Sequence, residues 1–372
     1  MLDAVVAGGG PAGAAAALVL ARAGHEVLLA EAAPEAFKVG ESLPPAARPL
    51  LRDLGVLEQV ERGGALALRA SGTSAAWGGP QLADVDFVRD PNGPGWHIDR
   101  TRFDALLRAA AAAAGVEVLE GVELRDVRRE GDGWSAERVP AAGAGATPAR
   151  LRARALFDAT GRRPAVARRT GARRARLDRL ASVHARVLAA RDDVDARTLV
   201  EATAGGWWYT ALVPGARRVV AFLTDADLMP ARMREPGGFA SALGATEHVG
   251  ARAAGLAIDS GPHVAAAHSA RLTPPCGAGW VAAGDAAIAF DPLSSQGILT
   301  ALYTGLRGAE ALSAWLAGGA AAPLDAYVRR VAAVAAAYDA ARAGYYSLER
   351  RWPGEPFWAR RHGPAGGGEP PG

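Results

Sequence analysis

Cysteine and lysine are almost absent from this sequence. Cys276 is the only cysteine and Lys38 the only lysine among 372 residues. A single cysteine excludes an internal disulfide and argues against a thiol-rich metal site. The seven histidines show no metal-ligand spacing, so we expect no bound metal. Chemistry that depends on a buried ammonium group can use only Lys38.

Long apolar runs and basic clusters are also missing. The N-terminal apolar run is interrupted at Gly9-Gly10-Pro11, and Asp3 stands where a signal peptide would carry basic residues. The formal net charge is +3, and pairs such as Arg173-Arg174 are too short to form a nucleic-acid-binding surface. We therefore expect a cytoplasmic protein that binds neither a membrane nor nucleic acid.

The first thirty-one residues predict a dinucleotide-binding unit. A short apolar strand is followed by Gly8-Gly9-Gly10-Pro11-Ala12-Gly13, an Ala-rich helix and a second strand that ends at Glu31. Gly8 permits a tight turn, Gly10 lets the backbone approach a pyrophosphate, and Gly13 lets the helix pack close to the strand. The free N–H groups of the helix start would face the phosphates. Glu31, eighteen residues after Gly13, would accept hydrogen bonds from ribose hydroxyls.

The rest of the chain alternates between two kinds of pattern. Apolar stretches near residues 116–119, 151–158 and 279–285 predict further strands of a parallel sheet. Between residues 182 and 223 apolar and polar residues alternate, which is typical of an antiparallel sheet with one solvated face. Helices are expected at about residues 296–317 and 324–342. The chain therefore combines a parallel and an antiparallel sheet.

Two later segments narrow the dinucleotide to FAD. Phe157–Arg162 is a strand that ends in a D-A-T-G turn, and Gly284–Ala287 precedes Asp291–Ile298 before a long helix. Flavoproteins with a single nucleotide fingerprint often bring a D-A-T-G turn near the adenylate half of FAD. The second segment resembles the flavin-contacting motif of class A flavoprotein monooxygenases, the para-hydroxybenzoate hydroxylase superfamily. That motif runs G-D-A-A-H, then a proline, then G-Q-G. Here Ile288 replaces the usual histidine, and Ser295 replaces a glycine.

The resemblance extends from Leu2 to Arg361 and implies a fold. It predicts an α/β protein with a Rossmann-like FAD-binding domain of the para-hydroxybenzoate hydroxylase type, an antiparallel β-sheet substrate domain and a C-terminal helical segment. The predicted boundaries are 1–72, 100–172 and 273–322 for the FAD-binding domain, 73–99 and 173–272 for the substrate domain, 323–362 for the helical segment and 363–372 for a disordered tail.

The resemblance also implies contacts with FAD. Asp285 would hold ribityl hydroxyls, and Pro292 would lie against the isoalloxazine. The N–H groups of Gly297 and Ile298 would face its pyrimidine edge, where a helix N-terminus stabilises the negative charge of reduced flavin. The superfamily has an arginine that reaches the cofactor at the position of Arg100. The other implied contacts are Gly40, Glu41, Ser42, Gly161, Gly284 and Gln296.

Three stretches resemble one branch of this superfamily, the flavin-dependent halogenases. They are Gly40–Pro44, Asp291–Ile298 and Tyr345–Arg361. Relatives in that branch include flavoproteins that hydroxylate or oxidise tryptophan in a protein precursor during quinone-cofactor maturation. The resemblance therefore leaves two reactions to compare, halogenation and hydroxylation.

The residues that tryptophan halogenases need are missing from the matching positions. Those enzymes use a buried lysine, expected near Trp77, and a glutamate at the position of Ser294. Lys38 lies before the Gly40 turn instead, and the W-x-W-x-I-P signature is degraded to Trp207–Pro214. Halogenation by the lysine route is therefore disfavoured, and a halogenase of a lysine-independent kind is kept as an alternative.

We predict an FAD-dependent monooxygenase that hydroxylates an electron-rich aromatic ring. The ring would be indole-like or phenol-like, including a tryptophan in a peptide or a carrier-bound intermediate. Reduced FAD would add O2 at C4a, and the hydroperoxide would transfer oxygen to the ring. No second G-x-G-x-x-G follows a strand, so NAD(P)H would dock transiently or a separate flavin reductase would supply electrons. A prenyl-reducing flavoprotein of the geranylgeranyl reductase type and a non-catalytic dinucleotide-binding scaffold also fit the dinucleotide motif.

Candidate reaction residues are few. The acid–base candidates are Asp86, His97, Tyr209 and Asp291. The rings of Trp207, Trp208 and Tyr209 are candidates for stacking on an aromatic substrate, with core packing of a strand as the alternative.

Overall fold

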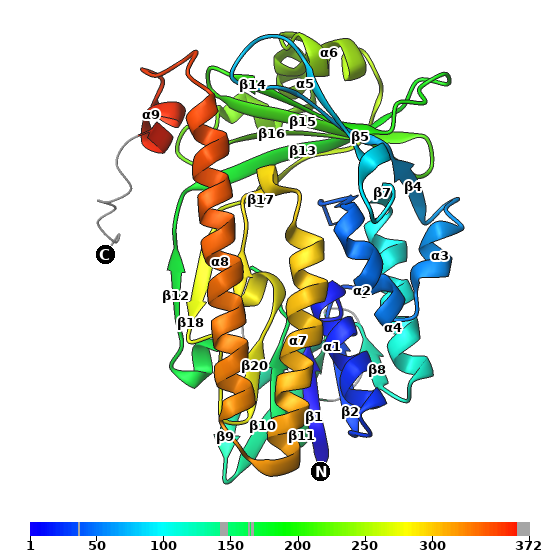
Figure 1. Cartoon of the computed structure of the whole chain (residues 1–372), viewed down its shortest axis with the longest axis vertical. Helices are drawn as coiled ribbons and strands as arrows, with labels where there is room; N and C mark the ends of the chain where they lie inside the picture. Colours follow the sequence, from blue (N-terminus) through cyan, green and yellow to red (C-terminus); the bar gives the residue numbers. More distant parts are fainter. Residues whose placement is uncertain (36–37, 142–147, 163, 165–166, 363–372) are drawn as a thin grey trace.

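Two large sheets lie one above the other in the molecule (Figure 1). The computed structural model describes residues 1–35, 38–141, 148–162, 164 and 167–362. The predicted tail at residues 363–372 lies outside the described residues. Parallel and antiparallel sheets are both present, as the sequence predicts.

The first sheet is built around β1, whose strand neighbours are β2 and β11. In the described residues its order is β19-β20-β11-β1-β2-β8, and β10 and β9 continue it antiparallel from β11. Ala4, Val5 and Val6 of β1 are fully buried. Ala4 and Val6 pack against helices on one face, and Val5 packs with residues of β9 and β10 on the other. Its strands are β1 (Leu2–Ala7), β2 (Val27–Glu31), β8 (Glu117–Glu120), β9 (Val122–Glu130), β10 (Gly133–Pro140), β11 (Ala149–Asp158), β19 (Cys276–Gly277) and β20 (Trp280–Ala282).

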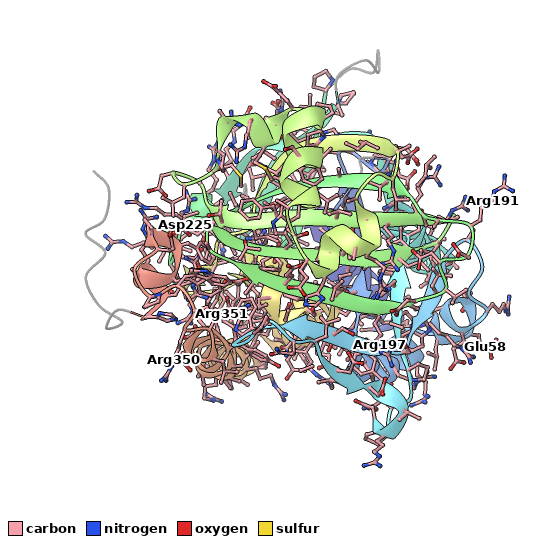
Figure 2. All side chains as sticks on the ribbon, turned by 90° about the horizontal axis from the view of Figure 1, so that it is seen from above. Glu58, Arg191, Arg197, Asp225, Arg350 and Arg351 are labelled. Atoms are coloured by element: carbon pink, nitrogen blue, oxygen red, sulfur yellow. The ribbon has the colours of Figure 1, made fainter. Side chains whose placement is uncertain are left out.

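The second sheet is antiparallel except where β5 joins β14. Its order in the described part of the chain is β17-β13-β16-β15-β14-β5-β6. The sequence predicts one solvated face, but helices α5 and α6 cover that face (Figure 2) and pack on Trp208 and Phe222. Its strands are β5 (Gly72–Ala76), β6 (Ala83–Asp86), β13 (Leu180–Leu188), β14 (Arg197–Thr203), β15 (Gly206–Val213), β16 (Arg217–Asp225) and β17 (Ile258–Ala266).

Short elements fill the space beside the two sheets. Two small sheets have the orders β3-β7-β4 and β12-β18-β21 in the described residues. Their strands are β3 (Ser42–Leu43), β4 (Ala67–Ala70), β7 (Gly95–Ile98), β12 (Arg173–Arg176), β18 (Ala270–Thr273) and β21 (Ile288–Ala289). The helices of the chain are α1 (Pro11–Arg22), α2 (Arg48–Asp53), α3 (Leu57–Glu61), α4 (Arg100–Ala113), α5 (Pro236–Gly244), α6 (His248–Ala253), α7 (Gly297–Gly318), α8 (Ala322–Leu348) and α9 (Pro356–His362).

The C-terminal helices connect the two sheets. Helix α7 packs against α1, and α8 runs from the first sheet up to the antiparallel sheet (Figure 1). There Tyr346 of α8 and Trp358 of α9 enter a buried aromatic cluster with Trp207 of β15. Arg361 of α9 forms an ion pair with Asp225, the last residue of β16, and Figure 2 shows Asp225 next to α9. None of the described helices is both long and apolar enough to cross a membrane.

Helix α1 lies unusually close to its neighbours because two glycines leave no room for a side chain. A Cβ atom at Gly13 would lie 1.8 Å from the carbonyl oxygen of Gly8, and one at Gly305 would lie 2.3 Å from that of Ala12. This is the packing role that the G-x-G-x-x-G spacing predicts for Gly13. Gly10 differs, since the nearest atom to its added Cβ is a carboxylate oxygen of Asp104 at 3.9 Å.

We predict that Gly13→Ala destabilises the fold and that Gly10→Ala does not. The methyl group at position 13 must displace backbone atoms, and overpacking of this kind costs about 1–3 kcal/mol. At Gly10 the φ angle is −74°, which alanine adopts freely. Urea unfolding of the two flavin-free variants measures the difference. Equal free energies of unfolding for Gly13→Ala and the unchanged protein would contradict the packing argument.

Candidate functional site

A cleft of about 1380 Å³ opens between the two sheets. One wall follows the carboxyl ends of β1, β2 and β11, and the other carries side chains of β14, β15 and β16. Since β2 and β11 lie on opposite sides of β1, the loops that leave these strands diverge and leave a crevice. Ligands of open α/β sheets bind in crevices of this kind.

One end of the cleft is formed by the turn between β1 and α1. Gly8 and Gly10 line it, and Gly8 has a φ of +98°, a conformation that favours glycine. Within the described residues, no side chain caps α1 at Gly10 and no acidic residue lies in its first turn. The N–H groups at the helix start therefore stay available to an anionic ligand.

Glu31 is held at the same end of the cleft by the backbone. Its carboxylate accepts a hydrogen bond of 2.6 Å from the N–H of Gly9 and one of 3.1 Å from that of Ala33. Lys38 lies 3.6 Å from this carboxylate and 3.3 Å from that of Asp104. A glycine turn, an uncapped helix start and an acid at the end of β2 fit the diphosphate and ribose of a dinucleotide.

Beside the glycine turn, the cleft is lined by two segments that lie far apart in sequence. A Cβ atom at Gly8 would lie 2.4 Å from the Ala159 carbonyl oxygen, and one at Gly284 would lie 3.0 Å from the Cβ atom of Ala12. Arg162, after β11, donates to the carbonyl oxygen of Phe290 at 2.8 Å and lies 3.3 Å from the carboxylate of Asp285. Gly161 and Gly284 line the cleft beside them. Arg162 therefore joins the D-A-T-G turn to the segment that leads into α7.

Asp291 holds that segment against α8. Its carboxylate accepts hydrogen bonds from the Leu293 N–H at 3.0 Å and the Tyr346 hydroxyl at 2.8 Å, and the Arg342 guanidinium lies 3.6 Å away. The N–H of Asp291 donates to the Tyr338 hydroxyl at 2.9 Å. Burial raises the pKa of Asp291, although these partners act in the opposite direction. Because both carboxylate oxygens are engaged, the geometry favours a positioning role for Asp291 over the acid–base role predicted from sequence.

Glu41 and Tyr209 connect the two walls of the cleft. The Tyr209 hydroxyl, on β15, donates a short hydrogen bond to Oε2 of Glu41, and both residues line the cleft. Burial raises the pKa of Glu41, and burial together with the Glu41 carboxylate raises the pKa of Tyr209 well above its usual value. Arg100 lies beside this pair and donates to the Gly40 carbonyl oxygen at 3.2 Å. An acid and a phenol are thus placed together inside the cleft.

Most of the residues predicted to contact FAD line this one cleft. The lining includes Gly8, Gly10, Pro11, Ala12, Glu31, Gly40, Glu41, Ser42, Arg100, Gly161, Gly284, Asp285, Pro292, Gly297 and Ile298. Of the predicted reaction and substrate residues, Trp207, Tyr209 and Asp291 line it too. Gly13 lies behind the turn, where it packs on Gly8. The two flavin segments, from Gly8 to Glu31 and from Gly284 to Ile298, therefore share one cleft.

Three sequence-based candidates lie outside the cleft, which corrects the roles predicted for them. His97 is buried on β7, where its Nδ1 donates to the Leu212 carbonyl oxygen at 2.9 Å and its Nε2 accepts from the Thr198 hydroxyl at 2.8 Å. Burial lowers the pKa of His97 to about 4, so it stays neutral. Trp208 packs on α5 because neighbouring strand residues face opposite sides of a sheet. Asp86 lies on the exposed strand β6, 3.0 Å from Arg197.

Several cleft residues carry no signal in the sequence. Ser182, Thr198 and Val200 come from β13 and β14 and face the cleft through strand alternation. The Ser42 hydroxyl lies 3.4 Å from that of Thr198, which already donates to His97, so the Ser42 hydroxyl is the donor of that pair. Only the register of the sheets places these side chains together.

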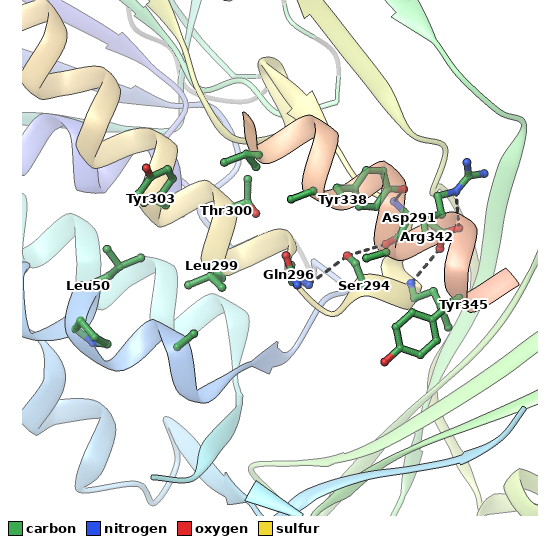
Figure 3. Close-up of a pocket in the computed structure, with 16 residues that line it drawn as sticks. Leu50, Asp291, Ser294, Gln296, Leu299, Thr300, Tyr303, Tyr338, Arg342 and Tyr345 are labelled. Atoms are coloured by element: carbon green, nitrogen blue, oxygen red, sulfur yellow. Dashed lines mark hydrogen bonds and ion pairs between the residues drawn. The ribbon is translucent and has the colours of Figure 1, made fainter. Parts of the chain in front are cut away.

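A second cavity of about 530 Å³ lies on the other side of the loop that precedes α7 (Figure 3). Alternate residues of the loop face the two spaces: Pro292 and Ser295 line the cleft, whereas Ser294 and Gln296 line the cavity. Gln296 is therefore not in the cleft, where the sequence places it among the FAD contacts. Helices α2, α7 and α8 supply the other walls, with Leu50, Leu299, Tyr303, Tyr338 and Tyr345 among their lining residues. Asp291 and Leu293 line both spaces.

Comparisons with known proteins agree with this geometry. LodB of Marinomonas mediterranea, which carries the name of an FAD-dependent oxidoreductase, is 28% identical over 365 residues, 97% of this chain and 96% of its own. Matches to curated halogenases are partial, and the aligned part spans less than half of the length of those proteins. The tryptophan 2-halogenase of Chondromyces crocatus, for example, is 37% identical over 34% of this chain and 24% of its own.

Two solved structures resemble nearly the whole chain. The myxobacterial chondrochloren halogenase CndH superposes with a TM-score of 0.86 at 26% identity, over 97% of this chain and 85% of that one. The peptidyl tryptophan dihydroxylase QhpG, essential for tryptophylquinone cofactor biogenesis, superposes with a TM-score of 0.77 at 25% identity, over 97% and 79%. The family model of the FAD binding domain matches residues 1–341. The chain therefore belongs to the FAD binding domain family, as an enzyme of the FAD-dependent oxidoreductases with a halogenase-type fold.

Proposed function

We propose that this enzyme hydroxylates an electron-rich aromatic ring, of the indole or phenol type, with FAD and O2. The proposal includes a tryptophan side chain within a peptide as substrate. It is supported by the likeness to a peptidyl tryptophan dihydroxylase over 97% of the chain and by the full-length match to LodB. NAD(P)H or a separate flavin reductase would supply the electrons.

The observation that favours oxygen transfer over halogenation is the position of the only lysine. Lys38 is committed to Glu31 and Asp104, at the end of the cleft formed by the glycine turn. Ser294, which lines the second cavity, stands where tryptophan halogenases carry a glutamate, and its hydroxyl donates to the Asp291 carbonyl oxygen at 3.0 Å. The ammonium and carboxylate groups of the lysine route are therefore missing beside the loop before α7.

Different residues of the chain would hold FAD, position the ring and exclude water. The turn at Gly8 and Gly10 would hold the diphosphate of FAD, and Asp285 and the start of α7 would hold its flavin end. When bound, FAD supplies the two-electron chemistry that activates O2. Trp207 and the neighbouring apolar residues of the antiparallel sheet would position the ring and exclude water. The contacts of Asp291 with Tyr338, Arg342 and Tyr346 of α8 hold the loop before α7 in place.

The second cavity offers a place for the part of the substrate that is not oxidised. Its volume of about 530 Å³ falls in the range of small-molecule sites. Its walls are mostly apolar or aromatic, and it meets the cleft at Leu293. We infer that a peptide or carrier-bound substrate would place a neighbouring group there while its ring enters the cleft.

A halogenase of a lysine-independent kind is the second candidate, favoured by the likeness to CndH. An activated phenol needs less assistance than an indole, so the missing ammonium would matter least for such a substrate. The two reactions differ in what the product gains, one oxygen or one halogen.

We predict a gain of one oxygen atom in the product. The reduced, FAD-loaded enzyme is mixed in air with N-acetyltryptophanamide, a tryptophan-containing peptide or a simple phenol, with and without bromide. Product mass by high-resolution mass spectrometry gives the answer. A halogenated product that appears only with bromide would replace hydroxylation by the second candidate, and an unchanged mass under every condition would remove both.

Filling the second cavity tests whether it holds part of the substrate. Ala341 lines the cavity on α8, so the ring in Ala341→Phe occupies its space. Ala340 is exposed on the same helix and does not line the cavity, which makes Ala340→Phe the matched control. We expect Ala341→Phe to raise KM for a tryptophan-containing peptide about tenfold or more and to leave KM for N-acetyltryptophanamide within about twofold, since loss of a buried contact of about 1.4 kcal/mol is tenfold. Equal effects of the two variants on the peptide would remove the cavity from the substrate path.

A further inference from the structure

Glu41 has a buried carboxylate oxygen without a partner. The residue is 3% exposed and lines the cleft, and its Oε2 accepts the hydrogen bond from Tyr209. Its Oε1 accepts no hydrogen bond from any residue that the structure describes. Buried polar atoms in proteins are almost always paired, so an unpaired carboxylate oxygen in a ligand cleft points to a group that binds there.

Glu41 is singular among the acids of the cleft. Glu31 is bound by backbone N–H groups, Asp285 by Arg162, and Asp291 by Leu293 and Tyr346. Of the described carboxylates that line the cleft, Glu41 is the one with a buried oxygen that accepts no hydrogen bond. Among the described carboxylates of the cleft, the buried acceptor without a partner is therefore one atom, Oε1 of Glu41.

The surroundings of Glu41 fit an aromatic ring. Its partner Tyr209 lies on β15 two residues from Trp207, and both side chains line the cleft. Val200 and Leu223, from the neighbouring strands, line the same wall with apolar side chains. The hydroxyls on this wall already donate elsewhere, that of Thr198 to His97 and that of Ser182 to the Ala265 carbonyl oxygen. A ring that packs there lies mostly among apolar side chains, and the buried carboxylate oxygen without a partner that it meets is that of Glu41.

We propose that Oε1 of Glu41 accepts a hydrogen bond from the ring N–H or O–H of the substrate and takes that proton during oxidation. Tyr209 is the positioning residue that holds the carboxylate. The proposal rests on the proposed function and narrows its substrates to rings whose N–H or O–H is conjugated with the carbon that is oxidised.

O2, the reduced flavin and the substrate ring supply all the atoms and electrons of the reaction. The ring carbon bonds to one oxygen atom of O2, and the ring N–H or O–H proton moves to Glu41. The second oxygen atom leaves as water, with the two electrons and two protons of the reduced flavin. The ring carbon then loses its C–H proton, which reaches the new oxygen through solvent and completes the hydroxyl group, while Glu41 returns its proton to the ring nitrogen or oxygen, which restores the aromatic ring and the carboxylate.

The role of Glu41 makes binding depend on pH in a defined direction. Burial raises the pKa of Glu41, while the Tyr209 hydroxyl, the backbone N–H groups of Gly40 and Glu41 and the positive charge of Arg100 lower it. The carboxylate acceptor is present above this pKa and is lost as the pH falls through it. Removing the Tyr209 hydroxyl raises the pKa further, so the loss begins at a higher pH in Tyr209→Phe.

Two probes and four proteins test the proposal by binding, without turnover. The probes are N-acetyltryptophanamide and its 1-methylindole analogue, titrated into the oxidised, FAD-loaded protein by calorimetry. The unchanged enzyme is expected to bind the N–H probe at least about tenfold more tightly, because a hydrogen bond to a charged group is lost on methylation. Glu41→Leu is expected to bind both probes equally. In Tyr209→Phe the preference disappears at a higher pH. In the control Tyr327→Phe, which removes a hydroxyl that lines neither the cleft nor the second cavity and donates to the Ala282 carbonyl oxygen, it does not move.

Each outcome decides the role of Glu41. Equal affinities for the two probes in the unchanged enzyme, no affinity for either, or a preference that survives in Glu41→Leu overturns the proposal. Should Glu41→Leu fail to fold, Glu41→Gln replaces it: it keeps an acceptor of the same shape and must bind the N–H probe without the pH dependence. An enzyme that oxidises N-acetyltryptophanamide yet ignores N-methylation keeps the proposed function and loses the role of Glu41. An enzyme that prefers the N–H probe but gives no oxidised product keeps the role of Glu41 in binding and loses the proposed function.

Discussion

The buried carboxylate of Asp291 is the contact on which the geometry of the cleft depends. It ties the loop before α7 to Tyr346 and, more weakly, to Arg342 of α8, and the same residue's N–H reaches Tyr338. A buried charge that loses a partner destabilises a fold strongly, so these contacts fix the loop and the helix relative to each other. Because α8 also reaches the antiparallel sheet, one carboxylate sets the separation between the flavin-side loop and the wall that faces it.

A second set of polar contacts closes the cleft from the side of the Gly40 turn. Tyr209 donates to Glu41, and Ser42 reaches Thr198, whose hydroxyl is held in turn by the neutral ring of His97. Both contacts join the segment that contains the Gly40 turn and β3 to strands of the antiparallel sheet. The cleft is thus bounded by hydrogen bonds rather than by apolar packing alone, and hydrogen bonds fix direction as well as distance. This suits a site in which a planar cofactor and a planar substrate must keep a constant separation.

The sequence predicts those parts of the site that are local, and misses those that depend on register. The G-x-G-x-x-G turn, Glu31 and the segment from Asp285 to Ile298 are short motifs in which spacing alone defines geometry, and they line one cleft as predicted. Trp208 is misplaced because both faces of the antiparallel sheet are covered, so polarity does not reveal which side faces the ligand. His97 is misplaced because Leu212 and Thr198 of that sheet, far away in sequence, take both of its ring nitrogens. The second cavity draws residues from position 46 to position 345 and has no sequence signature at all.

The electrostatics of the loop before α7 support the oxygen chemistry that we propose for this halogenase-type fold. The hydroxyl of Ser294 donates to the backbone of its own turn, so the loop presents a neutral group where a halogenase presents a carboxylate. With Lys38 held by Glu31 and Asp104 at the far end of the cleft, no ammonium group is available beside the loop to hold a halogen oxidant. Glu41 is the acid of the cleft that contacts the antiparallel sheet, through its hydrogen bond with Tyr209 of β15. In the proposed reaction the substrate ring therefore enters the cleft itself. No lysine on the described part of the chain is placed to carry an oxidant from the cleft to the second cavity.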